Sequence, residues 1–478
     1  MKSTCYQFLQ TIKSKLKHVS LAMLLSCTTI GLHAQWQAYS PIFSDTLGAF
    51  DLRIAQNNDQ VAWCVAMKYE VTPTAYNWLP SEKLSFAKTS DGGNTWTGGT
   101  IPMGPEPYAS SLCPISANTA WASGLDLDFV SYVLRTDDGG ETWTRQLEDG
   151  FAGASGYVNF VHFWDDQNGV AMGDPTESNT DPVPFYEIYT TTDGGLNWTR
   201  VPSANIPLPA ANEFGSSAVC QVRGDYVWFG TIDAVSFAGK RLFRSKDRGH
   251  HWEVLSAADD KINIFSFADT LHGLGVKRIS PTTAKLIYTD DAGDTWTDLP
   301  LYAASELMTS WVLIPVSNYI LMTRRPNNVV GPFRTMLSKD LGQSWIELGT
   351  TEHAAAIKFS SPTVGYAGEL QPANHATRMY KYAGSPLVGL FSGLELDARV
   401  TLGPNPTSDF LNVQIEVTEP AEFMLMLHDI QGRLIARKNL EKTAQGNAKF
   451  DLSNVPAGIY TLTVSTEKGH LTRAVSKI

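Results

Sequence analysis

An eight-residue motif that recurs along the chain constrains the fold more than any other feature of the sequence. Its pattern is Ser/Thr-x-Asp-x-Gly-x-(Thr/Ser/Asn/His)-Trp, and it occurs six times at intervals of about fifty residues. The Asp carboxylate can accept backbone N–H bonds across a tight turn, the Gly supplies a positive φ, and the Trp can pack between neighbouring sheets. We therefore expect each copy to be a structural turn that fastens a hairpin. The six copies carry Asp91, Asp138, Asp193, Asp247, Asp291 and Asp340, and end at Trp96, Trp143, Trp198, Trp252, Trp296 and Trp345.

Strand-like runs fill the intervals between the copies. One such run, for example Arg241–Arg244 or Lys285–Tyr288, stands directly before each motif. Two more precede it, as Asn263–Phe267 and Leu274–Lys277 do before the fifth motif. Four strands per period of about fifty residues are typical of the blades of a β-propeller.

The two ends of this repeat region complement one another. After the sixth motif three further strand-like runs follow, at 354–360, 364–369 and 377–382, without a motif or a final strand. The segment Gln35–Tyr39 resembles that missing fourth strand, so we expect it to pair near Tyr380 and close a seventh blade. Closure removes the open sheet edges that favour aggregation. The sequence thus predicts an all-β chain with a seven-bladed β-propeller over residues 35–384.

The N-terminus has the layout of a secretory signal peptide. Basic residues precede an acid-free apolar run, Val19–Leu32, which ends in small and polar residues, and we expect cleavage after Ala34, so that residues 1–34 are removed. An alternative is a lipid-attachment site at Cys27, but the apolar run continues past it, which favours ordinary cleavage. No later run approaches the length that a bilayer requires, so we expect no transmembrane segment in the mature chain.

Composition excludes several classes of protein. The chain has 37 Lys+Arg against 48 Asp+Glu and a net charge of -11, the wrong sign for a nucleic-acid binder. Beyond the leader, Cys64, Cys113 and Cys220 each lie in an apolar strand-like run, which predicts buried thiols. No CxxC or paired His spacing is present, and the Asp-rich turns lack the ligand pattern of a calcium loop. We therefore predict no metal site and no cofactor.

A second domain follows the repeats. Residues 385–399 read as a linker, and residues 400–478 alternate apolar and polar positions between Asn-Pro, Gln-Gly and Ala-Gly turns. This pattern favours a small immunoglobulin-like β-sandwich.

Both regions resemble known families. The eight-residue motifs resemble the Asp-box, or BNR, repeats of sialidases, family 74 xyloglucanases, the sortilin luminal domain and the photosystem II assembly factor propellers. These families share a fold and differ in function, so the resemblance implies a propeller and no particular activity.

The C-terminal region resembles the sorting domain of type IX secretion cargo. The residues that carry this resemblance are Asn405, Pro406, Asp429, Gly432, Gly458, Ile459, Tyr460 and the penultimate Lys477. The resemblance implies Sec export to the periplasm, passage through the outer-membrane translocon, and removal of the domain by a sortase-like protease. The expected partners are that translocon and that protease, and the expected location is the outer-membrane surface or the extracellular medium.

The catalytic residues of the enzyme relatives are only partly matched. Sialidases bind the substrate carboxylate with an arginine cluster whose first member lies in a Phe/Tyr-Arg-Ile-Pro motif, and the nearest match here, around Arg53, lacks both the aromatic residue and the Pro. Arg324 and Arg325 are further candidates at the rim of the propeller. The xyloglucanases place a catalytic Asp pair between two propellers, and this chain has one.

Insertions point to one face of the predicted propeller. They fall at 69–83, which includes Trp78, and at 173–182, 232–240 and 324–333, where second and third strands of a blade are joined. Asp174 and Glu213 would face one another there across adjacent blades. Such a pair can act as acid and base on a glycosidic bond at a separation of about 5 to 9.5 Å. Alternatively, the pair binds a cation, hydrogen-bonds sugar hydroxyls or caps turns.

Two classes of function remain from the sequence. The first is an exported binding propeller that recognises a glycan or a protein, with Arg53, Trp78, Arg324 and Arg325 as candidate contacts. The alternative is a secreted glycoside hydrolase, sialidase-like or xyloglucanase-like, that uses Asp174 and Glu213.

Overall fold

The structure is a computed structural model of the 478-residue chain. It describes residues 36–39, 42–44, 47–71, 76–151, 156–178, 181–236, 238–255, 262–280, 283–299, 306–315, 317–326, 333–351, 354–370, 377–384, 387, 398–429, 434–466 and 469–478. The predicted leader at 1–34 and nearly all of the predicted linker lie outside these residues.

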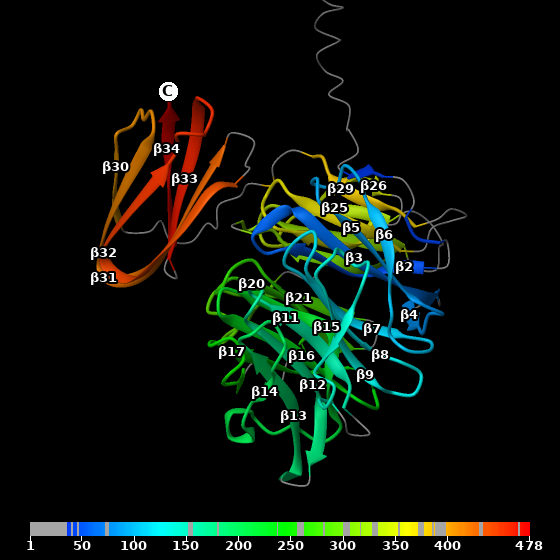
Figure 1. Ribbon diagram of the computed structural model, residues 1–478. Helices are drawn as coiled ribbons and strands as arrows, with labels where there is room; N and C mark the ends of the chain where they lie inside the picture. The colour runs from blue at the N-terminus through cyan, green and yellow to red at the C-terminus, as the bar shows by residue number, and fades with distance from the viewer. Residues whose placement is uncertain are drawn as a thin grey trace, which may run out of the picture.

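Seven antiparallel sheets follow one another along the chain (Figure 1). Each is built on four strands in sequence order, except that the first carries a fifth strand and the seventh takes its fourth strand from the N-terminus. Blade 1 comprises β2 (Leu47–Ala55), β3 (Asn58–Val71), β5 (Leu84–Thr89) and β6 (Thr97–Ile101), with β4 (Tyr76–Leu79) paired to β3. Blade 2 comprises β7 (Tyr108–Pro114), β8 (Ala120–Leu125), β9 (Ser131–Thr136) and β10 (Thr144–Gln146). Blade 3 comprises β11 (Val158–Phe163), β12 (Gly169–Ser178), β13 (Asp181–Thr191) and β14 (Thr199–Arg200), and a short 3-10 helix, η1 (Ser203–Asn205), follows it.

The remaining blades repeat this order. Blade 4 comprises β15 (Glu213–Arg223), β16 (Tyr226–Asp233), β17 (Gly239–Ser245) and β18 (Glu253–Val254). Blade 5 comprises β19 (Ile262–Phe267), β20 (Gly273–Ser280), β21 (Thr283–Thr289) and β22 (Thr297–Asp298). Blade 6 comprises β23 (Glu306–Leu313), β24 (Ile320–Pro326), β25 (Phe333–Ser338) and β26 (Ile346–Thr351). Blade 7 comprises β27 (Ala354–Phe359), β28 (Gly365–Glu369), β29 (Met379–Tyr382) and β1 (Trp36–Ala38).

The first strands of the blades form a closed ring. Each contacts the first strand of the next blade, and the last contact, between β27 and β2, completes the circle. The expected closure of blade 7 is confirmed, because Trp36 lies opposite Tyr382 and Ala38 lies opposite Tyr380. Trp36 is buried and packs edge-on against the rings of Phe359 and Tyr382. The all-β, seven-bladed architecture predicted from the repeats is therefore the one observed.

The six Asp motifs form the turns between third and fourth strands. In the first, the Asp91 carboxylate accepts from the Thr95 backbone N–H at 2.9 Å and from the Thr95 hydroxyl at 2.6 Å, while Thr89 Oγ1 accepts from Gly93 N–H at 2.9 Å. Burial opposes ionisation of Asp91, but the hydrogen bonds from Thr95 and Thr89 outweigh it and lower the pKa of the carboxyl to about 2. Gly93 has a φ of 82°, which the turn requires.

The Trp that ends each motif packs toward the preceding blade. Trp143 of blade 2 meets Trp63 of blade 1 edge-on at 6.4 Å between ring centroids, and Trp96 of blade 1 meets Tyr366 of blade 7 at 6.0 Å. These are the structural roles that the sequence predicts for the motif. Cys64, Cys113 and Cys220 are buried free thiols, also as predicted.

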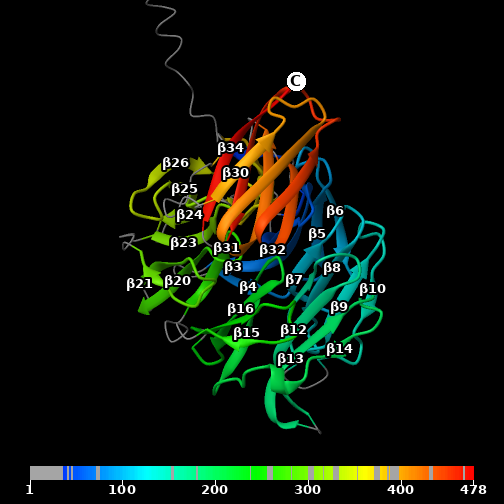
Figure 2. The same ribbon diagram turned by 90° about the vertical axis from the view of Figure 1, so that its left-hand side faces the viewer.

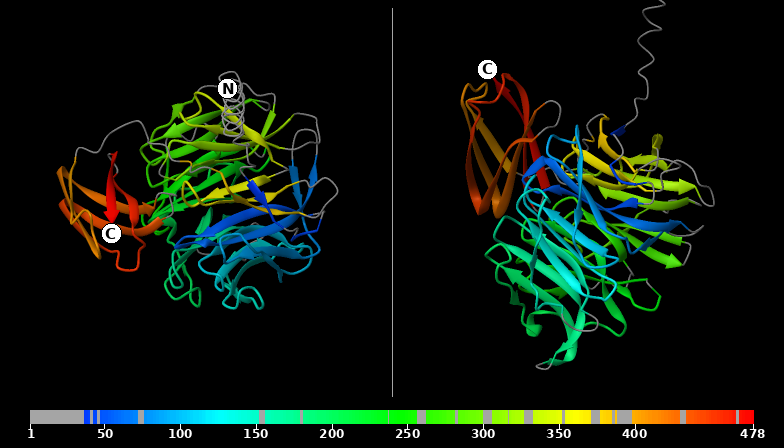
Figure 3. Two further views of the ribbon diagram at one scale, coloured as in Figure 1. Left: turned by 90° about the horizontal axis from the view of Figure 1, so that it is seen from above. Right: turned by 45° about the vertical axis from the view of Figure 1, so that its right-hand side comes forward.

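The C-terminal region forms a separate sheet with its own core, which is seen in front of the blades in Figure 2 and stands apart from them in Figure 3. Its strands are β30 (Ala398–Gly403), β31 (Phe410–Asp429), β32 (Leu434–Asp451), β33 (Gly458–Thr466) and β34 (Gly469–Lys477). The first half of β31 pairs with β30 and the second half with β33, while β32 follows β31 along its length. Buried Leu411, Val413 and Ile415 alternate with exposed neighbours. This arrangement agrees with the predicted immunoglobulin-like sandwich. None of the described residues belongs to a helix long and apolar enough to cross a membrane.

Candidate functional site

The first strands of the seven blades share one register position near the turn end of each strand. At this position each residue lies opposite the second strand of its own blade, close to the turn that joins the two strands. Arg53 acts electrostatically on Cys113, His162 and Lys358, so the positions of blades 1, 2, 3 and 7 lie near one another. We call this set the axial ring, and its members are Arg53, Cys113, His162, Gln221, Ser266, Val312 and Lys358.

Arg53 spans the axis from blade 1 to blade 4. Its guanidinium donates to the Asp51 carboxylate at 2.8 Å and to the backbone carbonyl of Cys220 at 3.2 Å. Asp51 also accepts the Leu112 N–H at 3.0 Å, so one carboxylate ties blade 1 to blade 2. Burial alone would lower the pKa of Arg53, but the neighbouring Asp51 more than offsets it and the pKa is raised.

Two further cations lie within the electrostatic range of Arg53. Arg223, near the end of β15, donates to the carbonyls of Ala268 at 3.2 Å and Val222 at 2.9 Å. Desolvation lowers the pKa of Arg223 to about 10, and Arg53 contributes to the shift. Desolvation likewise lowers the pKa of Lys358 to about 8, with Arg53 and Arg223 adding to the effect. At neutral pH all three side chains carry positive charge.

A thiol and an imidazole complete this end of the axis. Cys113 Sγ lies 3.7 Å from His162 Nδ1 and accepts the Phe163 N–H at 3.2 Å. Burial raises the pKa of Cys113 to about 11, and burial followed by the field of Arg53 lowers that of His162 to about 3. Both groups are therefore neutral at pH 7, which is the opposite of an activated thiolate–imidazolium pair. No cluster of three or more metal-ligating side chains occurs among the described residues.

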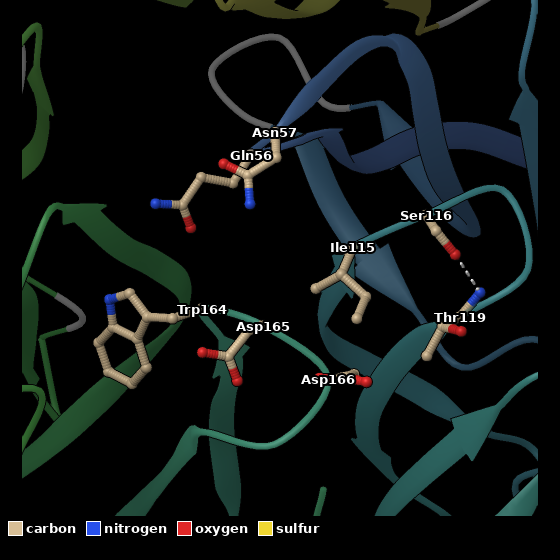
Figure 4. Close-up of a pocket in the computed structure, with 8 residues that line it drawn as sticks. All are labelled: Gln56, Asn57, Ile115, Ser116, Thr119, Trp164, Asp165 and Asp166. Atoms are coloured by element: carbon tan, nitrogen blue, oxygen red, sulfur yellow. Dashed lines mark hydrogen bonds between the residues drawn. The ribbon is translucent and has the colours of Figure 1, made fainter. Parts of the chain in front are cut away.

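A pocket of about 330 Å³ opens at the same end of the axis (Figure 4). It lies among the turns between first and second strands of blades 1, 2 and 3. Trp164 and Ile115 supply its apolar wall, and Trp164 packs edge-on against His162 of the axial ring at 4.9 Å. The remaining wall is polar and consists of Gln56, Asn57, Ser116, Thr119, Asp165 and Asp166.

Asp174 lies between blades 3 and 4, near the loops that join second and third strands. Its Oδ1 accepts the Asn159 side-chain amide at 2.7 Å and the Gly215 N–H at 2.7 Å. It is 4% exposed, and desolvation raises the pKa of its carboxyl to about 7 in spite of these two hydrogen bonds. The Asp174 carboxyl thus has the ionisation of a general acid but little access to solvent.

Glu213 begins β15, and both oxygens of its carboxylate are bonded to neighbouring groups. Its carboxylate binds the Arg241 guanidinium, accepts the Thr231 hydroxyl at 2.6 Å and accepts the Ala210 N–H at 2.7 Å. Burial opposes its ionisation, but these donors, Arg241 first, lower its pKa. Because Asp174 bonds Gly215, two residues beyond Glu213, the structure brings both acids to one strand. The Glu213 carboxylate caps a turn and forms an ion pair. Turn capping is one of the roles that the sequence left open.

The other sequence candidates lie apart from the axial ring. Trp78, on β4, packs edge-on against Phe50 at 5.0 Å and Tyr69 at 6.1 Å. Arg324 is half-buried on β24 in blade 6. The side chain of Arg325 lies outside the part of the chain that the structure describes. Of the binding candidates, only Arg53 belongs to the axial ring.

Sequence reasoning missed Arg223, His162 and Lys358. Each stands in an apolar strand-like run and belongs to no motif. Aligning the seven first strands by counting back from the Asp motifs would have placed His162 and Lys358 level with Arg53, but their convergence requires the ring to close.

The sequence motifs of the C-terminal domain converge on its last strand. The Asn405 side chain accepts the Ser476 N–H at 2.8 Å and donates to the Ala474 carbonyl at 2.9 Å. Gly458 lies opposite Lys477 in the β33–β34 pair. Tyr460 is buried and donates its hydroxyl hydrogen to the Pro456 carbonyl at 2.6 Å. The loop containing Asn405 and Pro406 thus fastens the terminal strand, and Gly432 lies outside the described residues.

Comparison with protein families identifies this region. Residues 402–477 match the family of secretion system C-terminal sorting domains, and the chain carries the sorting domain of the type IX system. No curated protein shows significant similarity to the chain.

Solved propeller structures are similar to the chain at low identity. "YCF48 bound to D1 peptide" is 16% identical, with 74% of this chain and 98% of that one covered and a TM-score of 0.48. The family 74 xyloglucanase of Xanthomonas campestris is 11% identical over 80% of this chain and 59% of that one, with a TM-score of 0.41. A Trypanosoma rangeli sialidase mutant is 10% identical over 92% and 88%, with a TM-score of 0.40. At these values the likenesses carry no argument about function.

Proposed function

Because the chain ends in a type IX sorting domain, we propose that it is an exported ligand-binding propeller whose site is the pocket at the axis. The sorting domain indicates delivery to the cell surface or the medium by the type IX system. The propeller is then the part that meets an extracellular ligand. The proposed partners of the C-terminal domain are the translocon and a sortase-like protease that removes it.

The pocket is the observation that carries the binding role. It is lined by the amides of Gln56 and Asn57, the Thr119 hydroxyl and the indole of Trp164 (Figure 4). Amides and hydroxyls can exchange hydrogen bonds with sugar hydroxyls, while an indole offers an apolar surface to a sugar ring. We propose a glycan as the ligand, and a protein segment is the alternative that the same polar wall accommodates.

A glycoside hydrolase is the second candidate function, and the raised pKa of Asp174 favours it. An acid with a pKa of about 7 suits protonation of a glycosidic oxygen. Its proposed partner Glu213, however, is held by Arg241, Thr231 and Ala210, which leaves it poorly placed to activate water. The binding role requires no such second carboxylate.

A glycan array probed with the exported chain tests the binding proposal. Gln56→Ala and Asn57→Ala should each reduce glycan binding about tenfold, because a lost hydrogen bond of about 1.4 kcal/mol changes an equilibrium tenfold. Gln343→Ala is the matched control, since Gln343 is an exposed amide on the Asp-motif turn of blade 6. Binding that is unchanged in both pocket variants contradicts the proposed site.

Hydrolysis monitored on the same glycans tests the alternative. Turnover that is lost in Asp174→Asn and kept in Gln56→Ala would favour the hydrolase. Deletion of residues 400–478 tests the export role, because normal arrival of the propeller at the cell surface without them contradicts it.

A further inference from the structure

Three cations from three blades lie near the turn ends of the first strands, which is the end at which the pocket opens, although none of them lines it. Arg53 of blade 1 reaches the Cys220 carbonyl of blade 4 at 3.2 Å, and the pKa of Lys358, in blade 7, responds to Arg53, Asp51 and Arg223. The chain as a whole has a net charge of -11, so this concentration of positive charge runs against its composition.

Two carboxylates act on these three cations: Asp51 is bonded to Arg53, and Asp269 acts on Arg223 through its field without forming an ion pair with it. Asp51 is the carboxylate bonded to Arg53, and its oxygens are occupied by Arg53 and by the Leu112 N–H. Arg223 donates only to neutral carbonyls and forms no ion pair with any described residue. Lys358 has no hydrogen bond or ion pair with any described residue.

Such an arrangement is costly unless a ligand supplies the missing charge. Arg223 and Lys358 are half-buried, and partial removal of a guanidinium or an ammonium from water without an ion-pair partner disfavours its charged form. Desolvation is the largest cause of the lowered pKa of each side chain. A structural role would pair each cation with a carboxylate, as Arg241 is paired with Glu213 within blade 4. Arg223 and Lys358 instead form no ion pair with any described carboxylate, although Asp269 and Asp51 act on them from further away.

We infer that the end of the axis bearing Arg53, Arg223 and Lys358 binds one oxyanion group, a carboxylate or a sulfate, of the ligand that occupies the pocket. This inference rests on the proposed binding site at the pocket and names the chemistry of its ligand. A guanidinium and an ammonium together match two oxygens of such a group. Asp165 and Asp166 line the pocket, and their carboxylates would repel further negative charge on the ligand. The part of the ligand that lies in the pocket is therefore neutral. This favours a glycan that ends in one acidic sugar residue over a polyanion.

Calorimetric titration at low chloride and pH 7 tests the inference with three probes. Free sulfate tests the oxyanion alone, glucuronic acid tests an oxyanion on a sugar, and glucose is the neutral counterpart. Lys358→Gln removes one cation without removing any hydrogen bond to a described residue, so the unfolding temperature should not fall. Lys285→Gln is the matched control, because it makes the same change of charge on β21, where Lys285 pairs with Asp298 at 2.7 Å.

We expect glucuronic acid or sulfate to bind, glucose not to bind, and Lys358→Gln to weaken binding at least tenfold while Lys285→Gln leaves it unchanged. Tighter binding of glucuronic acid than of sulfate identifies a glycan source, and the reverse identifies a free anion. The inference is overturned if neither anion binds at millimolar concentration, or if the two lysine variants behave alike.

The two proposals fail separately. Glycan binding that depends on Gln56 but not on Lys358 removes only the anion site. Anion binding without any array signal removes the proposed glycan ligand and leaves the anion site standing.

Discussion

Replacing Asp174 with Asn should stabilise the folded propeller at pH 8 and change its stability little at pH 4. The carboxyl is 4% exposed, and desolvation raises its pKa from 3.8 to about 7. Asn keeps an oxygen that can accept from Asn159 and Gly215, so the native hydrogen bonds survive the substitution.

The sign follows from proton binding in the two states. Because the folded-state pKa is raised, the native protein holds the Asp174 proton more tightly than the unfolded chain does. Its contribution to stability is fully present below about pH 4 and is lost as the pH rises toward 7. A difference of about three pKa units corresponds to about 4 kcal/mol, which is the expected gain of Asp174→Asn at pH 8.

Urea unfolding followed by tryptophan fluorescence at pH 5 and pH 8 measures this gain. The parent should lose stability between pH 5 and pH 8, and the variant should lose much less. Glu213→Gln is the contrasting variant, since it leaves Arg241 without its carboxylate and should destabilise on the order of 3 kcal/mol. If Asp174→Asn destabilises the protein at pH 8, the fold stabilises the Asp174 carboxylate instead of disfavouring it, its folded-state pKa is not raised, and the reasoning is wrong.

Three further predictions follow from the motif turns, the terminal strand and the axis. Thr89→Val should destabilise by about 1–3 kcal/mol in urea unfolding, because it leaves the buried Gly93 N–H without its acceptor; an unchanged midpoint would contradict the structural role of the motif. Asn405→Ala should remove two hydrogen bonds that fasten β34, among them that from Ser476 N–H, and reduce surface delivery measured by cell fractionation, whereas full delivery would contradict it. Sulfate affinity measured by calorimetry should fall as the pH rises through about 8, where Lys358 loses its proton, and a flat profile to pH 10 would exclude that ammonium as a ligand.

Most of the fold was predictable because its signals are local. Each Asp motif is a complete turn whose hydrogen bonds join residues four apart, such as Asp91 and Thr95, so the octet alone specifies its geometry. Regular recurrence of that turn fixes the number of blades, and Trp36 showed where the missing strand lies. The C-terminal domain was recognisable for a similar reason, since its motifs keep their order along the chain.

The candidate site was much less predictable. Asp174 and Glu213 were identified from their positions in loops. Only the structure shows that Arg241 forms an ion pair with Glu213 and that Asp174 is desolvated. Arg53 was selected by its resemblance to a sialidase motif. In the structure it belongs to a group of cations with Arg223 and Lys358, and no local sequence pattern identifies those two residues.

The sequence by itself therefore determined the number of blades, the turn chemistry and the sorting domain, because these depend on residues close together in the chain. Tertiary structure alone decided which charges meet at the axis, because Arg53 and Lys358 come from blades at opposite ends of the repeat. They become neighbours only when β27 packs against β2 and the ring closes. Electrostatic interactions depend on distance in space and on the water excluded between groups, and neither quantity is encoded in a local pattern.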